Sequence, residues 1–232
     1  MTQPATLWCG SVAQLLRRAA GCNVPWLSAA ETVRLATLTA PRRRDQFLAG
    51  RWLGRQALAA RHGGVPQDWQ LSAPADAAPR VISGPIVGSS ALGLAHSGDT
   101  VACVVADRAL GIDVERHNRR VRDVAGLADV ALSDAERMHW LDLPAQSRQV
   151  GFLSWWTLKE AWLKAHGRML NPATLRGIVA LPVRAEAANA RLWREADFTL
   201  ALVGLDAAAP LDLATPSPSS VVQWWRVSDA AA

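Results

Sequence analysis

Two pairs of charged residues are spaced so that they could act together on one substrate. Glu160 and Lys164 lie four residues apart within residues 152–170, FLSWWTLKEAWLKAHGRML, whose apolar pattern predicts an amphipathic helix. Asp113 and Glu115 lie two residues apart in LGIDVE, and residues two apart in a strand point to the same side. Carboxylates and an ammonium in this arrangement can hold a cation, accept a proton and stabilise negative charge.

The use of lysine points to the same helix. Of the 25 Lys and Arg residues only two are lysines, Lys159 and Lys164, and both lie in this segment. A guanidinium keeps its proton in a protein, whereas a partly buried ammonium can give its proton up. The alternative for Glu160 and Lys164 is an ordinary ion pair on a solvated helix face, which contributes about 0.2–0.5 kcal/mol.

Composition narrows the class of protein. With 232 residues and 50 % hydrophobic content, the chain can bury one large core or two small ones. The net charge of +5 favours an anionic partner, but the basic residues form only short clusters without a nucleic-acid-binding signature. Three cysteines without metal-ligand spacing favour a reducing cytosol. No apolar run is long enough to span a bilayer, so we expect a cytoplasmic protein without a membrane segment.

Both strands and helices are expected along the chain. Strands are predicted at residues 6–9, 92–95, 100–106, 110–115, 177–181, 190–194, 198–203 and 221–227. Helices are predicted at residues 13–20, after the cap Ser28 as far as Pro41, at 42–61, at 133–140 and at 152–170. Short edge strands and loops are expected at 64–90, a basic turn at 116–122 and a Pro/Ser-rich loop at 210–220.

The sequence also contains a weak internal repeat. Shifting the chain by 105 residues places Phe47, Leu48, Leu53, Leu58 and Ala60 on Phe152, Leu153, Leu158, Leu163 and Ala165. We therefore expect an α+β fold of two similar halves in a pseudo-twofold arrangement, residues 1–109 and 110–232. Only the second half has the chemistry, because Gly54, Arg55 and Ala59 stand in the first half at the positions of Lys159, Glu160 and Lys164.

The order and spacing of two motifs resemble a known family. The strand Gly111–Glu115, GIDVE, and the helix Trp156–Lys164, WTLKEAWLK, match the G-I-D-x-E and W-x-x-K-E-x-x-x-K marks of the 4′-phosphopantetheinyl transferase superfamily. The chain is similar to the type of about 230 residues with two halves that activates synthetases such as surfactin synthetase. Ala161 after the Lys-Glu pair is typical of the branch with alanine there.

The resemblance is less complete upstream of these motifs. His96 stands in register with the family histidine, but Ser83-Gly84-Pro85 replaces a Gly-Lys-Pro loop, and Gly93 and Ala95 replace Asn and Ser. Arg34 and Arg51 lie where the family carries basic residues for coenzyme A. The coenzyme-binding residues that the resemblance implies are Arg34, Arg51, Gly84, Pro85, Ala95, His96 and Lys164.

The resemblance implies transfer of the 4′-phosphopantetheine arm of coenzyme A to a serine of an apo acyl or peptidyl carrier protein, with release of 3′,5′-ADP. It implies Mg²⁺ on Asp113, Glu115 and Glu160. Glu160 would be the base for the serine. Lys164 would neutralise the charge of the departing phosphate or give it a proton, and His96 would hold a phosphate of the coenzyme. Coenzyme A is expected between the halves of a monomer that binds neither nucleic acid nor membrane.

Two other functions stay open at this point. The changes at Gly84, Gly93 and Ala95 also fit a non-catalytic relative that binds a carrier protein or coenzyme A without transfer. A basic nucleic-acid-binding module is a third possibility, but it leaves Asp113 and Glu115 unexplained.

Overall fold

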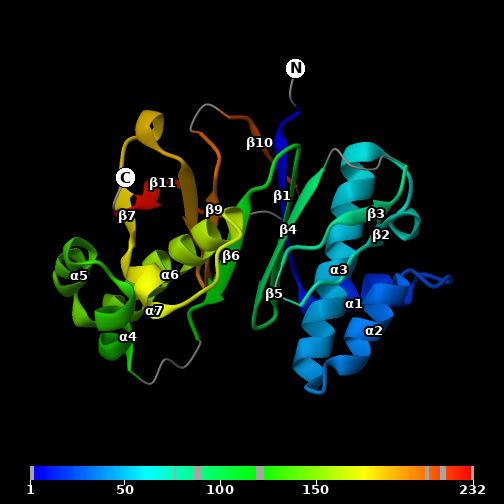
Figure 1. Ribbon diagram of the computed structural model, residues 1–232, viewed down its shortest axis with the longest axis horizontal. Helices are drawn as coiled ribbons and strands as arrows, with labels where there is room; N and C mark the ends of the chain where they lie inside the picture. The colour runs from blue at the N-terminus through cyan, green and yellow to red at the C-terminus, as the bar shows by residue number, and fades with distance from the viewer. Residues whose placement is uncertain are drawn as a thin grey trace. The chain divides into compact units, whose positions relative to one another are not determined.

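The computed structural model describes residues 3–75, 77–85, 90–118, 123–206, 209–214 and 218–230. The chain divides into two compact units. Unit 1 comprises residues 1–110 and 210–218, and unit 2 comprises residues 111–209 and 219–232. Each unit combines a sheet of mostly antiparallel strands with a long helix, so the predicted α+β class is confirmed (Figure 1).

Unit 1 is built around a sheet of strand order β10-β1-β5-β4. Its strands and helices are β1 (Ala5–Ser11), α1 (Val12–Ala20), α2 (Ala29–Thr37), α3 (Pro41–His62), β2 (Gln70–Leu71), β3 (Val81–Ser83), β4 (Ala91–Ser97), β5 (Thr100–Ala106) and β10 (Leu211–Leu213). Strands β4 and β5 form an antiparallel hairpin, and β2 pairs separately with β3. Helix α3 lies across β5, β1 and β4. The sheet therefore shields one side of a 22-residue helix.

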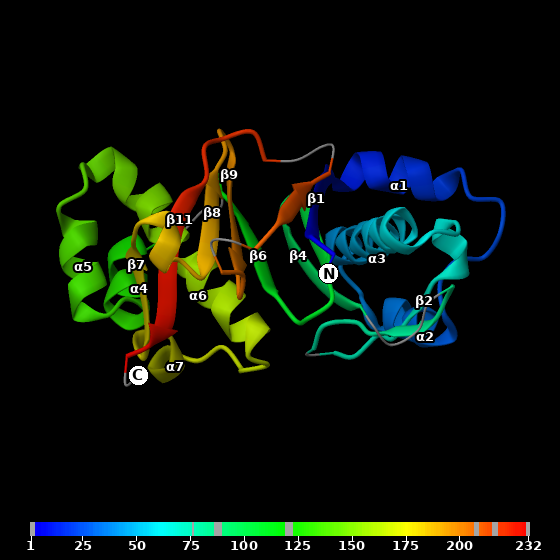
Figure 2. The same cartoon turned by 90° about the horizontal axis from the view of Figure 1, so that it is seen from above.

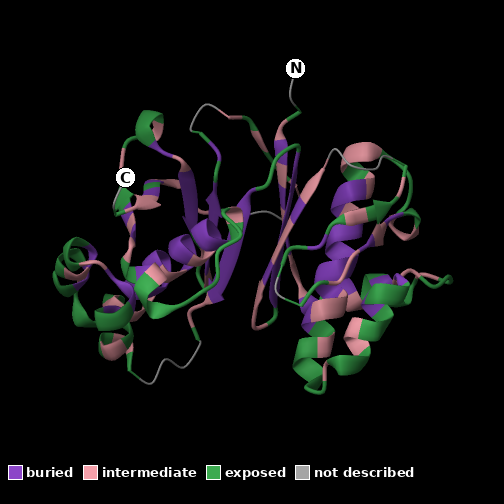
Figure 3. Cartoon of the chain, viewed as in Figure 1, coloured by how far each residue is buried: buried purple, intermediate pink, exposed green. Residues whose placement is uncertain are grey.

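The core of unit 1 explains why α3 forms there. Trp52, Leu53 and Leu58 of the helix and Val101 and Cys103 of β5 belong to one buried cluster. Removing apolar side chains of this kind from water stabilises a fold by about 25 cal/mol per Å². Figure 3 shows the buried stretch running along α3, while α2 is largely exposed. The sheet thus shields the helix face that the sequence marks as apolar.

Unit 2 is built around a sheet of strand order β6-β9-β8-β11-β7. Its strands and longer helices are β6 (Gly111–Arg116), α4 (Val124–Ala131), α5 (Asp134–Leu141), α6 (Arg148–Ala165), α7 (Pro172–Arg176), β7 (Ile178–Pro182), β8 (Ala190–Arg194), β9 (Phe198–Val203) and β11 (Gln223–Asp229). Figure 2 shows α6 beside this sheet, with α4 and α5 next to it. Short 3₁₀ turns lie at Pro66–Asp68, Ala145–Ser147 and Ala185–Ala187.

A glycine allows α6 to lie close to β6. A Cβ atom on Gly111 would stand 1.7 Å from the carbonyl oxygen of Ala161, which is far inside van der Waals contact. Phe152, Leu153 and Leu158 bury the same helix in a cluster with the sheet. The first residue of the GIDVE motif therefore sets the distance between the two elements that carry the motif residues.

Several observed elements differ from the predicted ones. Helix α6 ends at Ala165 and not at Leu170, because Gly167 takes a φ of 61° and the Arg168 N–H bonds to the carbonyl of Leu163 at 2.9 Å. Helices α4 and α7 were not predicted. Strand β10 lies where a loop was expected and pairs in parallel with β1 of unit 1. Part of the predicted basic turn, residues 119–122, lies outside the described residues.

Within the described part of the chain, every helix is too short or too polar to cross a bilayer.

Candidate functional site

Strand β6 turns both of its carboxylates toward α6. Asp113 pairs across the sheet with Ala201 of β9, and Glu115 pairs with Thr199. Since Ala201 belongs to the apolar cluster beneath α6, the strand face that carries the acids is the face that the helix covers. Asp113 is 4 % exposed and Glu115 is 7 % exposed. The predicted common orientation of the two acids is therefore what the strand pairing produces.

Lys164 reaches from α6 to the first of these carboxylates. Its Nζ lies 2.6 Å from Oδ1 of Asp113, in an ion pair whose ammonium is 42 % exposed and whose carboxylate is 5 % exposed. The other oxygen of Asp113, Oδ2, is buried and has no hydrogen-bond partner among the described residues. A buried carboxylate oxygen without a partner is unfavourable, so this atom is suited to bind a cation or a donor.

The charges around this pair act on both pKa values. Burial raises the pKa of Asp113 above its ordinary value, against the opposing effects of Lys164, the Val114 N–H and the Glu160 side chain. For Lys164, burial alone lowers the pKa, but the charges of Asp113, Glu160 and Glu115 outweigh it and the pKa is raised. Lys164 is therefore a cation at neutral pH, with three carboxylates acting on it.

The donor set can be compared with the needs of a divalent cation. In the described part of the chain, no three His, Cys, Asp or Glu side chains lie close enough together to hold a metal ion. Mg²⁺, however, often binds through one or two carboxylates and completes its shell with water and substrate phosphate. The orphaned Oδ2 of Asp113, with Glu115 on the same strand face, fits a site of that kind.

Neighbouring polar residues not singled out in the sequence lie beside Glu115. Thr199 is its cross-strand partner and also contacts the ring of His117, with Nε2 and Oγ1 2.9 Å apart. Arg194, opposite Thr199 on β8, donates to Ser154 Oγ of α6 at 2.9 Å. No local sequence signal links these residues, because the sheet register alone brings them to one row.

Lys159, the other lysine of the motif helix, lies apart from the carboxylates of β6. Its side chain is fully buried and forms an ion pair with Glu136 of α5, with Nζ and Oε2 2.6 Å apart. The only sequence sign of this contact is the capping box that Ser133 and Glu136 form at the start of α5. The two lysines of the chain therefore occupy different environments on one helix.

The remaining predicted residues lie in unit 1. His96, near the end of β4, has its Nε2 3.2 Å from a guanidinium nitrogen of Arg43. Arg51 of α3 is 6 % exposed and donates to the carbonyl of Ser72 at 2.8 Å. Arg34 of α2 is half-buried and lies 3.4 Å from the Thr37 hydroxyl.

Gly84 and Pro85 follow β3, while Ala95 is buried on β4 opposite Ala102 of β5. A Cβ atom on Gly84 would stand 2.5 Å from the ring of Trp69, so the glycine allows close packing against that ring. Ala95 points its methyl group into the protein, because it is only 4 % exposed.

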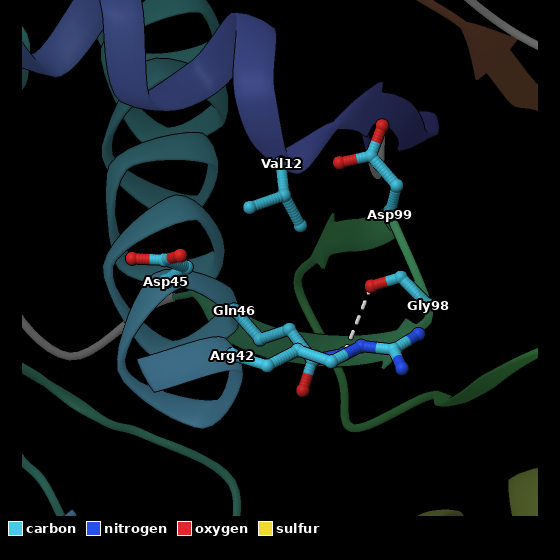
Figure 4. A pocket seen from close by; sticks show the side chains of 6 residues that line it. All are labelled: Val12, Arg42, Asp45, Gln46, Gly98 and Asp99. Atoms are coloured by element: carbon cyan, nitrogen blue, oxygen red, sulfur yellow. Dashed lines mark hydrogen bonds between the residues drawn. The ribbon is translucent and has the colours of Figure 1, made fainter. Parts of the chain in front are cut away.

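A pocket of about 400 Å³ lies in unit 1, at the start of α1 and α3 (Figure 4). It is lined by Val12, Arg42, Asp45, Gln46, Gly98 and Asp99. Gln46 donates across it to the carbonyl of Gly98 at 2.9 Å, and Asp99 accepts from the Ala13 N–H at 3.3 Å. None of the residues predicted from the sequence to act on a substrate lines this pocket.

The fold and the charged site define an α+β protein whose second unit presents acids from a strand opposite a lysine from a helix. Comparison with known proteins finds a similarity over the part of the chain that contains both motifs. Residues 109–208 match the family model described as "4'-phosphopantetheinyl transferase superfamily". This part of the chain is thus similar to the 4′-phosphopantetheinyl transferase superfamily, the family that its two motifs resemble.

Three curated relatives share part of the chain. The 4'-phosphopantetheinyl transferase HetI of Nostoc sp. (strain PCC 7120) is 33 % identical over 144 residues, which are 61 % of this chain and 60 % of that protein. The transferase gsp of Aneurinibacillus migulanus is 30 % identical over 82 residues, or 32 % of this chain and 30 % of its own. The transferase psf-1 of Bacillus pumilus is 28 % identical over 127 residues, or 55 % and 53 %. The chain thus spans less than two thirds of each relative.

Proposed function

We propose that the protein transfers the 4′-phosphopantetheine arm of coenzyme A to a serine of an apo carrier protein and releases 3′,5′-ADP. The observation that carries the proposal is the contact of Lys164 with Asp113 Oδ1, beside an Asp113 Oδ2 that is buried without a partner. The matched relatives are named 4'-phosphopantetheinyl transferases, which supports this activity.

The residues of unit 2 suit the reaction. The serine oxygen forms a bond to the β-phosphorus of the pyrophosphate, and the bond from that phosphorus to the bridging oxygen breaks. Glu160, which acts on Asp113 and Lys164, takes the serine proton directly or through water. The Lys164 ammonium, with its raised pKa, neutralises the charge that develops on the departing phosphate or gives it a proton.

We include magnesium in the proposal. Asp113 and Glu115 would hold the ion, and water and substrate phosphate would complete its shell, while Glu160 as a third ligand stays a prediction. The bound ion would neutralise pyrophosphate charge. The predicted coenzyme-binding roles of Arg34, Arg51, Gly84, Pro85, Ala95 and His96 stay predictions. We further propose that a single chain acts in the cytoplasm, since three cysteines without metal-ligand spacing favour a reducing compartment.

The test is direct. The purified chain is incubated with Mg²⁺, a fluorescent coenzyme A and several apo carrier proteins, with each carrier's Ser→Ala variant as the control. We expect label on at least one carrier serine, loss of labelling with EDTA and recovery with added Mg²⁺. Failure to label any carrier, together with no binding of coenzyme A, would overturn the proposal. Binding of coenzyme A without labelling would instead indicate a non-catalytic binder, and labelling unaffected by EDTA would refute the magnesium site.

A further inference from the structure

A buried ion pair holds α6 on the side away from Lys164. Lys159 and Glu136 are both 0 % exposed, and Lys159 Nζ lies 2.6 Å from Glu136 Oε2. The same ammonium donates to the carbonyls of Ala131 at 2.7 Å and Leu175 at 2.9 Å. An ammonium has three N–H donors, and Lys159 uses all three inside the protein. It therefore has no donor left for a substrate.

The carboxylate of this pair extends the network to the sheet. Glu136 Oε1 accepts from the Ala180 N–H of β7 at 2.7 Å, and Oε2 accepts from the Ser133 N–H at the start of α5 at 2.7 Å. Strands β7 and β6 are the two outer strands of the sheet. Helix α6 is thus bound through Glu136 toward one edge strand, and through Lys164 and Asp113 to the other.

Unit 1 contains a similar buried ion pair but no counterpart of Glu160 and Lys164. Ser28 and Glu31 form a capping box 105 residues before Ser133 and Glu136, at the interval of the helix repeat. Glu31 is also 0 % exposed, and Arg55 of the long helix donates to it at 3.0 Å and 2.5 Å. The first long helix has Arg55 and Ala59 at the positions of Glu160 and Lys164. Unit 1 therefore has the buried glutamate–cation pair but lacks the proposed catalytic pair.

We propose that Glu136 and Lys159 are positioning residues, which fix the rotation of α6 so that Glu160 and Lys164 meet the carboxylates of β6. Lys159 does not contact the substrate, although it belongs to the motif helix. Its three converging acceptors also explain why a lysine suits this position in a chain whose other basic residues are almost all arginines, since a planar guanidinium cannot direct donors to all three. The link to catalysis rests on the proposed function.

The composition of the chain allows a selective experiment. With only two lysines, protein labelled with ¹³C at lysine Cε gives one side-chain NMR signal for Lys159 and one for Lys164. In the wild type, we expect addition of Mg²⁺ and coenzyme A to shift the Lys164 signal and to leave the Lys159 signal in place. A shift of the Lys159 signal as large as that of Lys164 would overturn the proposal. This measurement needs no variant.

Two variants test the positioning itself. The first variant is Lys159→Met, and the milder Glu136→Gln replaces it if Lys159→Met does not fold. In the ligand-free variant, we expect the NMR signal of Lys164 to move toward that of an exposed lysine. We also expect kcat to fall about tenfold or more while the KM for coenzyme A changes little, because misplacing Glu160 and Lys164 weakens mainly their contacts with the transition state. Leu192→Ala, in the same core but outside the ion-pair network, is the control for lost stability.

The outcomes separate the two proposals. If the wild type labels no carrier, the proposed function fails, but the Lys164 signal of the ligand-free variants still tests the positioning. An unchanged Lys164 signal overturns the positioning proposal. A kcat within twofold of the wild type, or a loss no larger than that of Leu192→Ala, overturns its link to catalysis.

Discussion

The Lys164 ammonium lies 2.6 Å from Oδ1 of Asp113, across the junction of α6 and β6. The two partners are unequal, since the carboxylate is 5 % exposed and the ammonium 42 %. Asp113 is fixed by the sheet register, whereas Lys164 can reach solvent and a ligand. The carboxylate is thus the rigid partner of the site and the ammonium is the adaptable one.

Asp113→Asn removes the charge of this contact and keeps its shape. We expect the rate of transfer to fall by about 100-fold or more, because the site loses the buried negative charge that faces Lys164 and would bind a cation. The check is the initial rate of carrier labelling at saturating coenzyme A. Asp107→Asn is the matched control, since Asp107 pairs with Arg61 in unit 1 and is 42 % exposed. A labelling rate in Asp113→Asn equal to that of the control would contradict the role of Asp113.

Lys164→Arg keeps the positive charge but replaces a group that can give up a proton with one that does not. We expect kcat to fall more than the affinity for coenzyme A. Titration calorimetry gives the affinity, and single-turnover labelling gives the chemical rate. Turnover equal to that of the wild type would remove the role of Lys164 as a proton donor and leave charge neutralisation.

The sequence predicts best those elements that depend on local patterns. The strands at Thr100–Ala106, Ala190–Arg194 and Phe198–Val203 are observed with the predicted bounds, because apolar β-rich runs bounded by turn residues carry local information. The shared face of Asp113 and Glu115 follows from strand geometry alone. Such features need only neighbours in the sequence.

Features that depend on distant segments were not predictable in this way. Strand β10 forms by pairing with β1, whose residues lie some 200 positions earlier, so its own sequence has no decisive signal. The burial of Lys159 depends on acceptors from three other helices, Ala131, Glu136 and Leu175. From the helix pattern alone, both lysines are equally good candidates for chemistry.

Gly111→Ala should separate α6 from β6. The new methyl group would stand 1.7 Å from the Ala161 carbonyl, and a backbone atom cannot rotate away. We expect a lower Tm and about a tenfold or greater loss of labelling, because Lys164 and Asp113 move apart. Gly50→Ala is the control, since its nearest atom is 3.8 Å away and Ala favours the helix interior. Equal Tm and activity in the two variants would refute the close approach.

Glu31→Gln tests the buried pair of unit 1. The substitution leaves the Arg55 guanidinium buried without its counter-charge, and breaking such a pair costs about 3–5 kcal/mol of unfolding free energy. Chemical denaturation followed by Trp fluorescence measures this change. Asp107→Asn removes a partly exposed partner instead and should cost about 1 kcal/mol or less. A similar small cost for both variants would contradict a structural role of the Glu31–Arg55 pair.

Glu195 links the end of β8 to the segment before β11 and should make the stability of the protein depend on pH. Its Oε1 accepts from the N–H groups of Ser219 at 3.0 Å and Ser220 at 2.8 Å, and its Oε2 accepts from the Ser219 hydroxyl at 2.7 Å. Burial alone raises its pKa, but these bonds to the charged form outweigh burial, so the pKa lies below its ordinary value of 4.5. The carboxylate therefore stabilises the fold above that value, and this contribution is lost as the pH falls through the lowered pKa.

We expect the wild type to exceed Glu195→Gln in unfolding free energy by a constant amount at neutral pH, and the difference to shrink below about pH 4.5. Urea unfolding of both proteins from pH 7 to pH 3 measures it, and a difference that grows as the pH falls would show that these bonds do not favour the charged form.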